Sequence, residues 1–301
     1  MLDKSNENCG IFGAYDLEKR RNVTPLVIHG LTRLQHRGQL SAGITSSLET
    51  RSAVLKTFKN NGLVRDVFRL EDPTQAGELA ERYEGTACIG HTRYATSGNT
   101  NRTVAQPFEY KESMLPRWFA FCFNGNMANF QELSDQLKAE KYHLKYGIDT
   151  EIFMLIITKI MQSQSIGNFA EVFNYLQNQI DGAYNIAILN GKGDFAAYRD
   201  KHGFRPLCYG VQDNILFVAS EDSALRPFTA NIHPVQPGEM LTVSGDNPVV
   251  EREQIQNPEP AHCYLEWAYF ANVATTKDAI PVYLTRVKLG RGLADIEDQK
   301  L

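Results

Sequence analysis

The sequence lacks the features that mark nucleic-acid-binding and membrane proteins. Its 31 Lys and Arg are outnumbered by 35 Asp and Glu, which gives a net charge of -4 rather than the basic footprint that nucleic acids or anionic membranes require. It contains no apolar run near the length of a membrane span, and its first eight residues lack the apolar centre of a secretory signal. We therefore expect a cytoplasmic protein, with neither nucleic acid nor membrane as a partner.

The cysteines and histidines show no metal-site or disulfide spacing. The five cysteines are an odd number, widely separated, with no Cys-x-x-Cys pair, and the seven histidines show no metal-ligand pattern. Cys88 and Cys122 lie within apolar segments and are predicted to be small core residues. A composition with 43% hydrophobic and 22% charged residues is typical of a folded globular protein. Because the net charge gives no reason to expect nucleic acid or a membrane surface, a small molecule is the expected partner.

The pattern of apolar residues predicts an α+β fold dominated by antiparallel strands. Short runs rich in β-branched and aromatic residues predict strands at 11–15, 42–47, 53–58, 87–94, 118–123 and 184–189, with five more between 195 and 250. Helical spacing occurs at 26–35, 130–140, 150–162 and 169–179. Because the helix at 150–161 is apolar on nearly all sides, it is expected to pack between other layers of a sandwich. Residues 245–261, which contain three prolines, are the candidate linker.

Cys9 is the first candidate for chemistry. If the chain is cut before it, its thiol and a new α-amino group share one residue, and an amine with a pKa near 8 can accept the thiol proton. While Asn8 is attached, that nitrogen is an amide and cannot act as a base. Taken alone, a Cys-Gly pair near a terminus is more often structural.

Two further segments place charged or polar residues beside glycine. Gln35-His36-Arg37-Gly38 ends a predicted helix, with Gly38 in the position of a helix-terminating glycine, and His36 and Arg37 either cap the helix or shape a site. Arg93 follows a buried strand and precedes hydroxyl-bearing residues. Its guanidinium could clamp a carboxylate, or it could simply be solvated.

The last two candidates involve an asparagine and an aspartate. Asn124-Gly125-Asn126 follows a strand, and propensity favours a hairpin turn. The alternative is that the Asn124 amide and the Gly125 N–H donate to a developing oxyanion. Asp149 precedes the buried helix in N-cap position, where it either caps the helix or receives an ammonium group.

Together and in order, these motifs resemble the class II glutamine amidotransferases, which are N-terminal nucleophile hydrolases. The resemblance is strongest to the glutaminase domain of the amidophosphoribosyltransferases and extends from Cys9 to about Gly290. Besides the segments above, it includes matches at Gly90-His91-Thr92-Arg93-Tyr94-Ala95-Thr96, Ala105-Gln106-Pro107-Phe108, Asp149-Thr150-Glu151, Asp181-Gly182-Ala183-Tyr184 and 199–207.

The resemblance implies a four-layer αββα sandwich with two antiparallel sheets and assigns roles to the candidate residues. Cys9 is the nucleophile that forms a glutamyl thioester, and Asn124 and Gly125 stabilise the oxyanion. For substrate binding, the resemblance assigns Arg93 and Asp149 to the glutamine α-carboxylate and α-ammonium groups, and Tyr94 and Thr96 to the same pocket. The implied function is hydrolysis of glutamine to glutamate and ammonia, as the glutaminase part of an enzyme that makes 5-phosphoribosylamine in purine synthesis.

The resemblance also divides the chain. Residues 1–8 are expected to be a leader removed on maturation, 9–250 a glutamine amidotransferase domain, and 251–301 an exit segment that begins a missing phosphoribosyltransferase domain. That domain would act in cis or in trans, and a homo-oligomer is expected. The alternatives are a stand-alone glutaminase and a non-catalytic sensing module that serves a separate partner.

Three departures from the family pattern bear on these expectations. Leu40 stands where an acidic residue is usual, and Asn272-Val273-Ala274-Thr275 replaces Arg-Pro-Asp-Ser. No segment of the kind that binds phosphoribosyl pyrophosphate occurs. No cofactor or metal is therefore expected in this chain. Mg²⁺, and an iron–sulfur cluster with Cys263 as one ligand, are expected only if the synthase domain is present.

Overall fold

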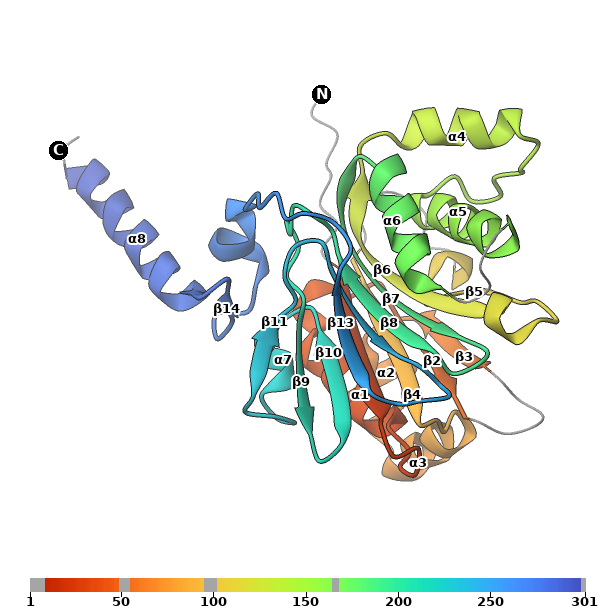
Figure 1. The fold of residues 1–301 in the computed structure, drawn as a ribbon. Helices are drawn as coiled ribbons and strands as arrows, with labels where there is room; N and C mark the ends of the chain where they lie inside the picture. Colours follow the sequence, from red (N-terminus) through yellow and green to blue (C-terminus); the bar gives the residue numbers. More distant parts are fainter. Residues whose placement is uncertain (1–8, 49–54, 95–101, 164–167, 299–301) are drawn as a thin grey trace.

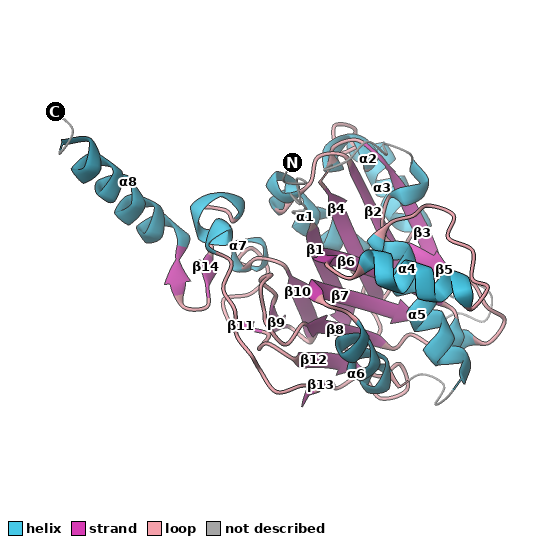
Figure 2. Ribbon diagram, turned by 90° about the horizontal axis from the view of Figure 1, so that it is seen from above, coloured by secondary structure: helices cyan, strands magenta, loops and turns pink. Residues whose placement is uncertain are grey.

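The structure, a computed structural model, describes residues 9–48, 55–94, 102–163 and 168–298. Two antiparallel sheets stack face to face, with helices on both outer faces (Figures 1 and 2). The four-layer αββα sandwich is therefore confirmed.

The first sheet has seven strands, which occur in the spatial order β11 (Ile232–Pro234), β9 (Cys208–Gln212), β10 (Ile215–Ala219), β1 (Gly10–Asp16), β4 (Ala87–Arg93), β2 (Ser41–Ser47) and β3 (Leu55–Asn61). The second has six strands, in the order β13 (Val250–Gln254), β12 (Glu239–Val243), β8 (Phe195–Arg199), β7 (Gly182–Asn190), β6 (Phe119–Met127) and β5 (Phe108–Tyr110). Because β13 pairs with β12, the predicted linker at 245–261 is partly wrong: it contributes a strand to the second sheet.

Helices cover the outer face of each sheet. The first sheet is covered by α1 (Thr24–Arg33), α2 (Val64–Val67), α3 (Pro73–Arg82) and α7 (Asp222–Leu225). The second is covered by α4 (Phe130–Ala139), α5 (Asp149–Ser163) and α6 (Phe169–Gln179). Single 3-10 turns occur at η1 (Gln35–Arg37), η2 (Arg102–Val104) and η3 (Leu115–Arg117). The buried helix is confirmed, since α5 contacts β5 and β6 as well as α4 and α6.

Three hydrophobic clusters fill the spaces between the layers, and strand alternation assigns side chains to them. On β6, Phe119, Phe121 and Phe123 pack beneath the helices, whereas Ala120 and Cys122 point into the cluster between the sheets. Cys88 packs under α1. Both Cys88 and Cys122 are fully buried, so their prediction as core residues is confirmed.

The exit segment extends away from this body. It consists of a π-helix, η4 (Glu266–Phe270), a small hairpin of β14 (Thr276–Lys277) and β15 (Ile280–Pro281), and α8 (Val282–Asp298). Figure 1 shows α8 projecting from the sandwich, and several of its apolar side chains are exposed: Tyr283, Leu284, Leu289, Leu293 and Ile296. Among the described residues, no helix has the length and apolarity to cross a membrane.

Candidate active site

Cys9 lies at one end of the space between the two sheets. It immediately precedes β1 and is 3% exposed. By strand alternation it lies on the same face as Ile11 and Tyr15, whose side chains point between the sheets. The pKa of the buried Cys122 thiol on β6 is raised by burial first and also by the nearby Cys88 and Cys9 thiols. Because β1 also contacts β6, the candidate nucleophile faces the second sheet.

Arg93 and Tyr94 lie next to Cys9 because of the strand register. Gly10 pairs with Thr92, so the residue before β1 is adjacent to the last residue of β4, which is Arg93. Arg93 is on the same strand face as Ala87 and Ile89, the face that points between the sheets. Both Arg93 and Tyr94 are half-buried. Thr96 lies outside the described residues.

Asn124 and Gly125 do not form the predicted hairpin turn. They lie within β6, which continues to Met127 because its partner β7 continues to Gly182, so Asn124 pairs with Asn185 and Gly125 with Tyr184. Glycine is required at 125 by packing, since a Cβ atom there would be 2.0 Å from the Ala183 carbonyl oxygen. The turn prediction from propensity is wrong because pairing with β7 extends the strand.

The side chain of Asn124 is buried, with 0% exposure. Within the part of the chain that the structure describes, neither its Nδ2 nor its Oδ1 atom has a hydrogen-bond partner. It shares its strand face with Ala120 and Cys122, so it points between the sheets, as Cys9 does. Because a buried amide without partners costs free energy, about 1–3 kcal/mol, an unfilled donor here is typical of a ligand site.

Two side chains that the sequence interpretation gave no role fix the backbone just before Asn124. The Gln106 amide accepts a hydrogen bond from Phe123 N at 2.6 Å and donates to Phe123 O at 3.2 Å. His91 Nε2 also lies 3.0 Å from that carbonyl oxygen. Burial lowers the pKa of His91 to about 3, so the ring is neutral. Both residues occur in motifs that carried the family resemblance, which was the available signal.

Asp149 lies where the start of α5 meets the end of β6. It is the first helical residue, and its carboxylate accepts a hydrogen bond from Met127 N at 2.9 Å. Burial raises its pKa. An ammonium group nearby would supply the counter-charge that this carboxylate lacks among its described contacts. Asp149 is thus the first residue of α5 rather than the residue before it, and its side chain also contacts the end of β6.

Glu151 fixes the loop before Asp149. Its carboxylate is 2% exposed and accepts hydrogen bonds from the backbone N–H groups of Lys145, Tyr146 and Gly147. These three contacts tie the loop to the first turn of α5. No role for Glu151 was inferred from sequence, because a glutamate in a first helical turn is ordinary.

Arg37 belongs to the site rather than to a helix cap. It is 0% exposed, and its Nε atom donates to the Cys9 carbonyl oxygen at 3.1 Å. Its Nη1 atom donates to Glu221 at 2.5 Å, and His36 Nε2 lies 3.0 Å from the same carboxylate. Of the two alternatives for His36 and Arg37, shaping the site is the one that the contacts favour.

Gly38 ends the turn η1, but not through a left-handed conformation. Its φ of -161° is extended. A Cβ atom at this position would be 2.5 Å from the Thr92 carbonyl carbon and 2.6 Å from Arg93 N. The prediction that Gly38 ends a helix in a left-handed conformation is therefore wrong. A glycine is needed here because the backbone at 38 passes close to the backbone of β4.

Opposite charges hold the Arg37 cluster ionised. Burial alone would lower the pKa of Arg37, but the Glu266 and Glu221 carboxylates outweigh it and keep this pKa above its usual value. Burial alone would raise the pKa of Glu221, and Arg37 and His36 outweigh it and hold this pKa well below its usual range. Arg37 and Glu221 are therefore both charged at neutral pH. No local pattern could reveal it, since Glu221 and Glu266 lie 184 and 229 residues from Arg37.

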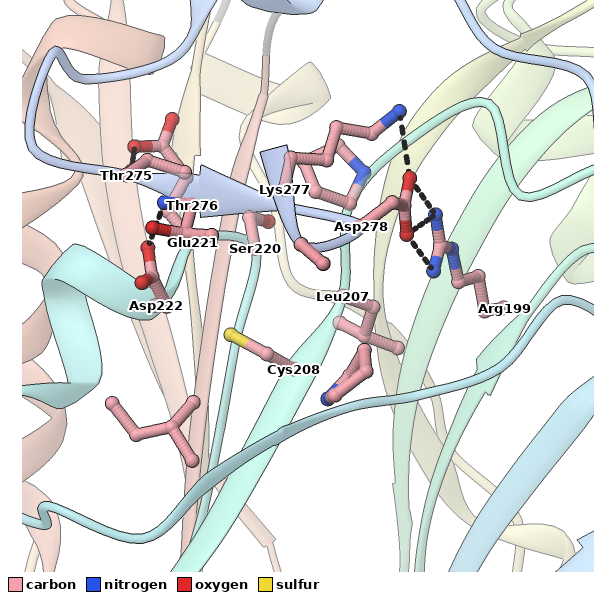
Figure 3. Close-up of a pocket in the computed structure, with 14 residues that line it drawn as sticks. Arg199, Leu207, Cys208, Ser220, Glu221, Asp222, Thr275, Thr276, Lys277 and Asp278 are labelled. Atoms are coloured by element: carbon pink, nitrogen blue, oxygen red, sulfur yellow. Dashed lines mark hydrogen bonds and ion pairs between the residues drawn. The ribbon is translucent and has the colours of Figure 1, made fainter. Parts of the chain in front are cut away.

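A pocket of about 270 Å³ lies where the exit segment meets the first sheet. Figure 3 shows Glu221 on one side of it, hydrogen-bonded to Thr275, and Asp278 on the other, paired with Arg199 and Lys277. The substituted segment Asn272-Val273-Ala274-Thr275 thus contacts the Arg37 cluster directly, through Asn272 N and Thr275 Oγ1. In the described part of the chain, no group of three or more His, Cys, Asp and Glu side chains could hold a metal ion, and Cys263 therefore has no partner ligands there.

Comparisons with known proteins point to the same family as the sequence motifs. Residues 91–227 match the family described as a glutamine amidotransferase domain. Curated relatives include the amidophosphoribosyltransferases of Pyrococcus horikoshii, 35% identical over 96% of this chain and 59% of the relative, and of Escherichia coli, 33% identical over 95% and 56%.

Solved structures show the same fold. The Bacillus subtilis glutamine phosphoribosylpyrophosphate amidotransferase, complexed with ADP and GMP, has a TM-score of 0.76 and 27% identity over 91% of this chain and 55% of its own. A structure described as the allosteric regulatory enzyme of purine biosynthesis has a TM-score of 0.81 and 28% identity over 95% and 58%. The chain therefore spans less than two thirds of the length of these relatives.

Proposed function

The chain belongs to the class II glutamine amidotransferases and matches the glutaminase region of amidophosphoribosyltransferases, and from this premise we propose that its mature form hydrolyses glutamine through Cys9. The observation that carries the proposal is the position of Cys9 at the end of the inter-sheet space that also holds the unpartnered Asn124 amide. A nucleophile and an oxyanion donor are the two parts that amide hydrolysis by thioester formation requires.

In the proposed reaction, removal of residues 1–8 converts the Cys9 nitrogen into an amine that can act as a base. The amine takes the thiol proton, and the sulfur attacks the carbonyl carbon of the glutamine side-chain amide. The tetrahedral intermediate then loses its C–N bond, and the ammonium group of Cys9 returns the proton to the departing ammonia. Water hydrolyses the thioester and releases glutamate.

Asn124 and Gly125 are the proposed oxyanion donors. Each such donor contributes about 3–4 kcal/mol to the transition state in comparable sites. Gln106 and His91 support this role, because they fix the Phe123 backbone immediately before the donors. Rigid backbone at this point means that no reorganisation is needed when the negative charge develops.

Arg93 and Asp149 are the proposed clamps for the free amino acid, one for the α-carboxylate and the other for the α-ammonium group. Arg93 ends β4 and Asp149 begins α5, and these positions support a pair of opposite charges at the rim of the proposed site. Tyr94 and Thr96 are proposed to line the same pocket. A substrate with both charges would satisfy both residues, which favours glutamine over amides that lack the zwitterion.

The proposed destination of the ammonia is a phosphoribosyltransferase domain, in the same chain or in a partner, within purine synthesis. The relatives extend well beyond the matched region, which supports a transferase partner. The exit segment offers it a surface, since Tyr264, Tyr269, Leu289 and Leu293 are about half or more exposed. A cytoplasmic location and a homo-oligomer remain part of the proposal, as do Mg²⁺ and an iron–sulfur cluster in that partner.

A glutaminase assay of the chain beginning at Cys9, with and without phosphoribosyl pyrophosphate, tests the proposal. We expect glutamate release that is abolished in Cys9→Ala, and stimulation by phosphoribosyl pyrophosphate if the synthase part is present or supplied. Intact mass should show Cys9 as the first residue of the purified wild-type protein. Retention of Asn8 together with no glutamate release would instead support a non-catalytic sensing module.

A further inference from the structure

A single carboxylate of the exit segment contacts both arginines of the buried charge cluster. Glu266 is 0% exposed. Its Oε1 atom accepts hydrogen bonds from Arg37 Nη2 at 3.1 Å and from Arg205 Nη1 at 3.3 Å, and its Oε2 atom accepts one from Arg37 Nη1 at 3.2 Å. Glu266 is thus the point at which the two arginines meet.

Each arginine also reaches a different side of the candidate active site. Arg37 Nε donates to the carbonyl oxygen of Cys9 at 3.1 Å, on the first sheet. Arg205 Nη2 donates to Asn126 Oδ1 at 3.3 Å, on β6 of the second sheet. Asn126 lies two residues beyond Asn124 on the same strand face. Through these two arginines, the Glu266 carboxylate therefore links the backbone of Cys9 to strand β6, which carries the proposed oxyanion donors.

We propose that Glu266 is a positioning residue for the glutaminase site: through Arg37 and Arg205 it fixes the separation between Cys9 and the donors on β6. The inference rests on the proposed function and adds the exit segment to it. The two donors and the nucleophile come from different sheets, so their mutual distance depends on contacts that cross between the sheets. Catalytic groups must be held within about 0.5 Å of productive geometry, and charged, bidentate contacts on rigid elements provide that restraint.

The alternative is that Glu266 only docks the exit segment. That segment has separate anchors, however: Asp278 pairs with Arg199 at 3.3 Å (Figure 3), and Thr276 N donates to Asp222 Oδ1 at 3.0 Å. Arg199 donates to the carbonyl oxygens of Gly203, Arg205 and Val235. Its contact with Arg205 is to the backbone, whereas the contact with Glu266 uses the Arg205 guanidinium. Asp278 is therefore a matched control, a partly buried carboxylate of the same segment that pairs with an arginine other than Arg37 and Arg205.

The test compares Glu266→Gln and Asp278→Asn in the full chain beginning at Cys9. We expect Glu266→Gln to lower kcat about 10- to 100-fold with KM for glutamine within about 3-fold, because the clamps Arg93 and Asp149 are untouched. Amide hydrogen exchange should accelerate in peptides covering 9–13 and 122–127. Asp278→Asn should change neither kcat nor exchange in these two peptides.

Equal kcat values and equal exchange for the two variants would overturn the proposal. If wild-type protein releases no glutamate, the proposed function fails, and hydrogen exchange alone decides whether Glu266 restrains the two segments. If Glu266→Gln does not fold, Asn126→Ala tests the Arg205 arm without removing a charge. We expect it to lower kcat and accelerate exchange in 122–127 but not in 9–13, and unchanged kcat and exchange would contradict the proposal.

Discussion

The residues proposed for chemistry and those proposed for recognition are held in different ways. Cys9 and Asn124 are buried on or beside central strands, and their surroundings are fixed by side chains from distant parts of the chain. Arg93, Tyr94 and Asp149 are half-buried at the ends of elements. In the proposed mechanism, the chemistry would therefore depend on the rigid interior between the sheets, and the charges of the substrate would be recognised at the rim.

The largest effect is expected from the nucleophile. Cys9→Ala should reduce glutamate release by about 10³-fold or more, because no other described residue at the site supplies a thiol with an adjacent amine. The melting temperature should change little. Cys88→Ala, which removes another buried thiol, is the control and should retain activity. Equal loss in both variants would mean that the cysteines act through folding rather than chemistry.

Asn124→Ala should have the next largest effect. Loss of one oxyanion donor is expected to lower kcat about 10²- to 10³-fold with little change in KM. Steady-state kinetics in glutamine measures both constants. Asn190→Ala, a buried asparagine at the opposite end of β7, should leave kcat unchanged. A rise in KM alone for Asn124→Ala would move this residue from the chemical to the recognition group.

Asp149→Asn should separate recognition from stability. The amide keeps an acceptor for Met127 N but loses the counter-charge for the ammonium group, so KM should rise about 10- to 100-fold while kcat at saturation stays similar. Burial raises the pKa of Asp149, so its ionised form opposes folding at neutral pH. The melting temperature at pH 7 should therefore be unchanged or higher, and a clear decrease would contradict the account.

The same pKa shift predicts an acid limit for binding. As pH falls through the raised pKa of Asp149, the carboxylate becomes neutral and KM for glutamine should rise, beginning at a higher pH than an ordinary aspartate would give. A profile of KM against pH in wild type and Asp149→Asn measures this effect. The variant should show no such rise.

The smallest effect is expected in the pH dependence of stability, from the titration of His91. Its pKa is about 3 when folded and 6.5 when exposed, so the unfolded chain binds the extra proton first as pH falls. Its contribution is complete above pH 6.5 and is lost on acidification, by at most about 1.4 kcal/mol per pH unit. Urea unfolding between pH 7 and 5 should show a shallower pH slope for His91→Gln. An equal pH slope in the variant and the wild type would mean that a group other than His91 titrates in this range.

The sequence predicted the layers better than the site. Strands with clear alternation, such as β6, and the apolar helix α5 followed from local patterns, because burial imposes a period of 2 or 3.6 on the chain. α3 was not predicted, although Asp72 caps it and Pro73 begins it, because it buries only Leu79 and Ala80 and so has no apolar stripe of helical spacing. Asn124-Gly125 was predicted as a turn because propensity describes isolated segments, and only the pairing with β7 makes it a strand.

The site residues were recognised through ordered motifs, but the side chains that hold them in place were not. Three side chains that support the site were not assigned this role from the sequence: Gln106, Glu151 and Glu266. Each contacts residues whose positions depend on the folded chain, and a polar residue that will be buried has no distinctive local pattern. Thr96 lies outside the described residues, and its role remains a prediction.

The most direct test of the account is acid quenching of glutamine turnover by the chain that begins at Cys9, followed by mass spectrometry of its peptides. The account predicts a γ-glutamyl adduct on the peptide that starts with Cys9, absent in Cys9→Ala and more slowly formed in Asn124→Ala. Glutamate release without this adduct, or turnover retained in Cys9→Ala, would contradict it.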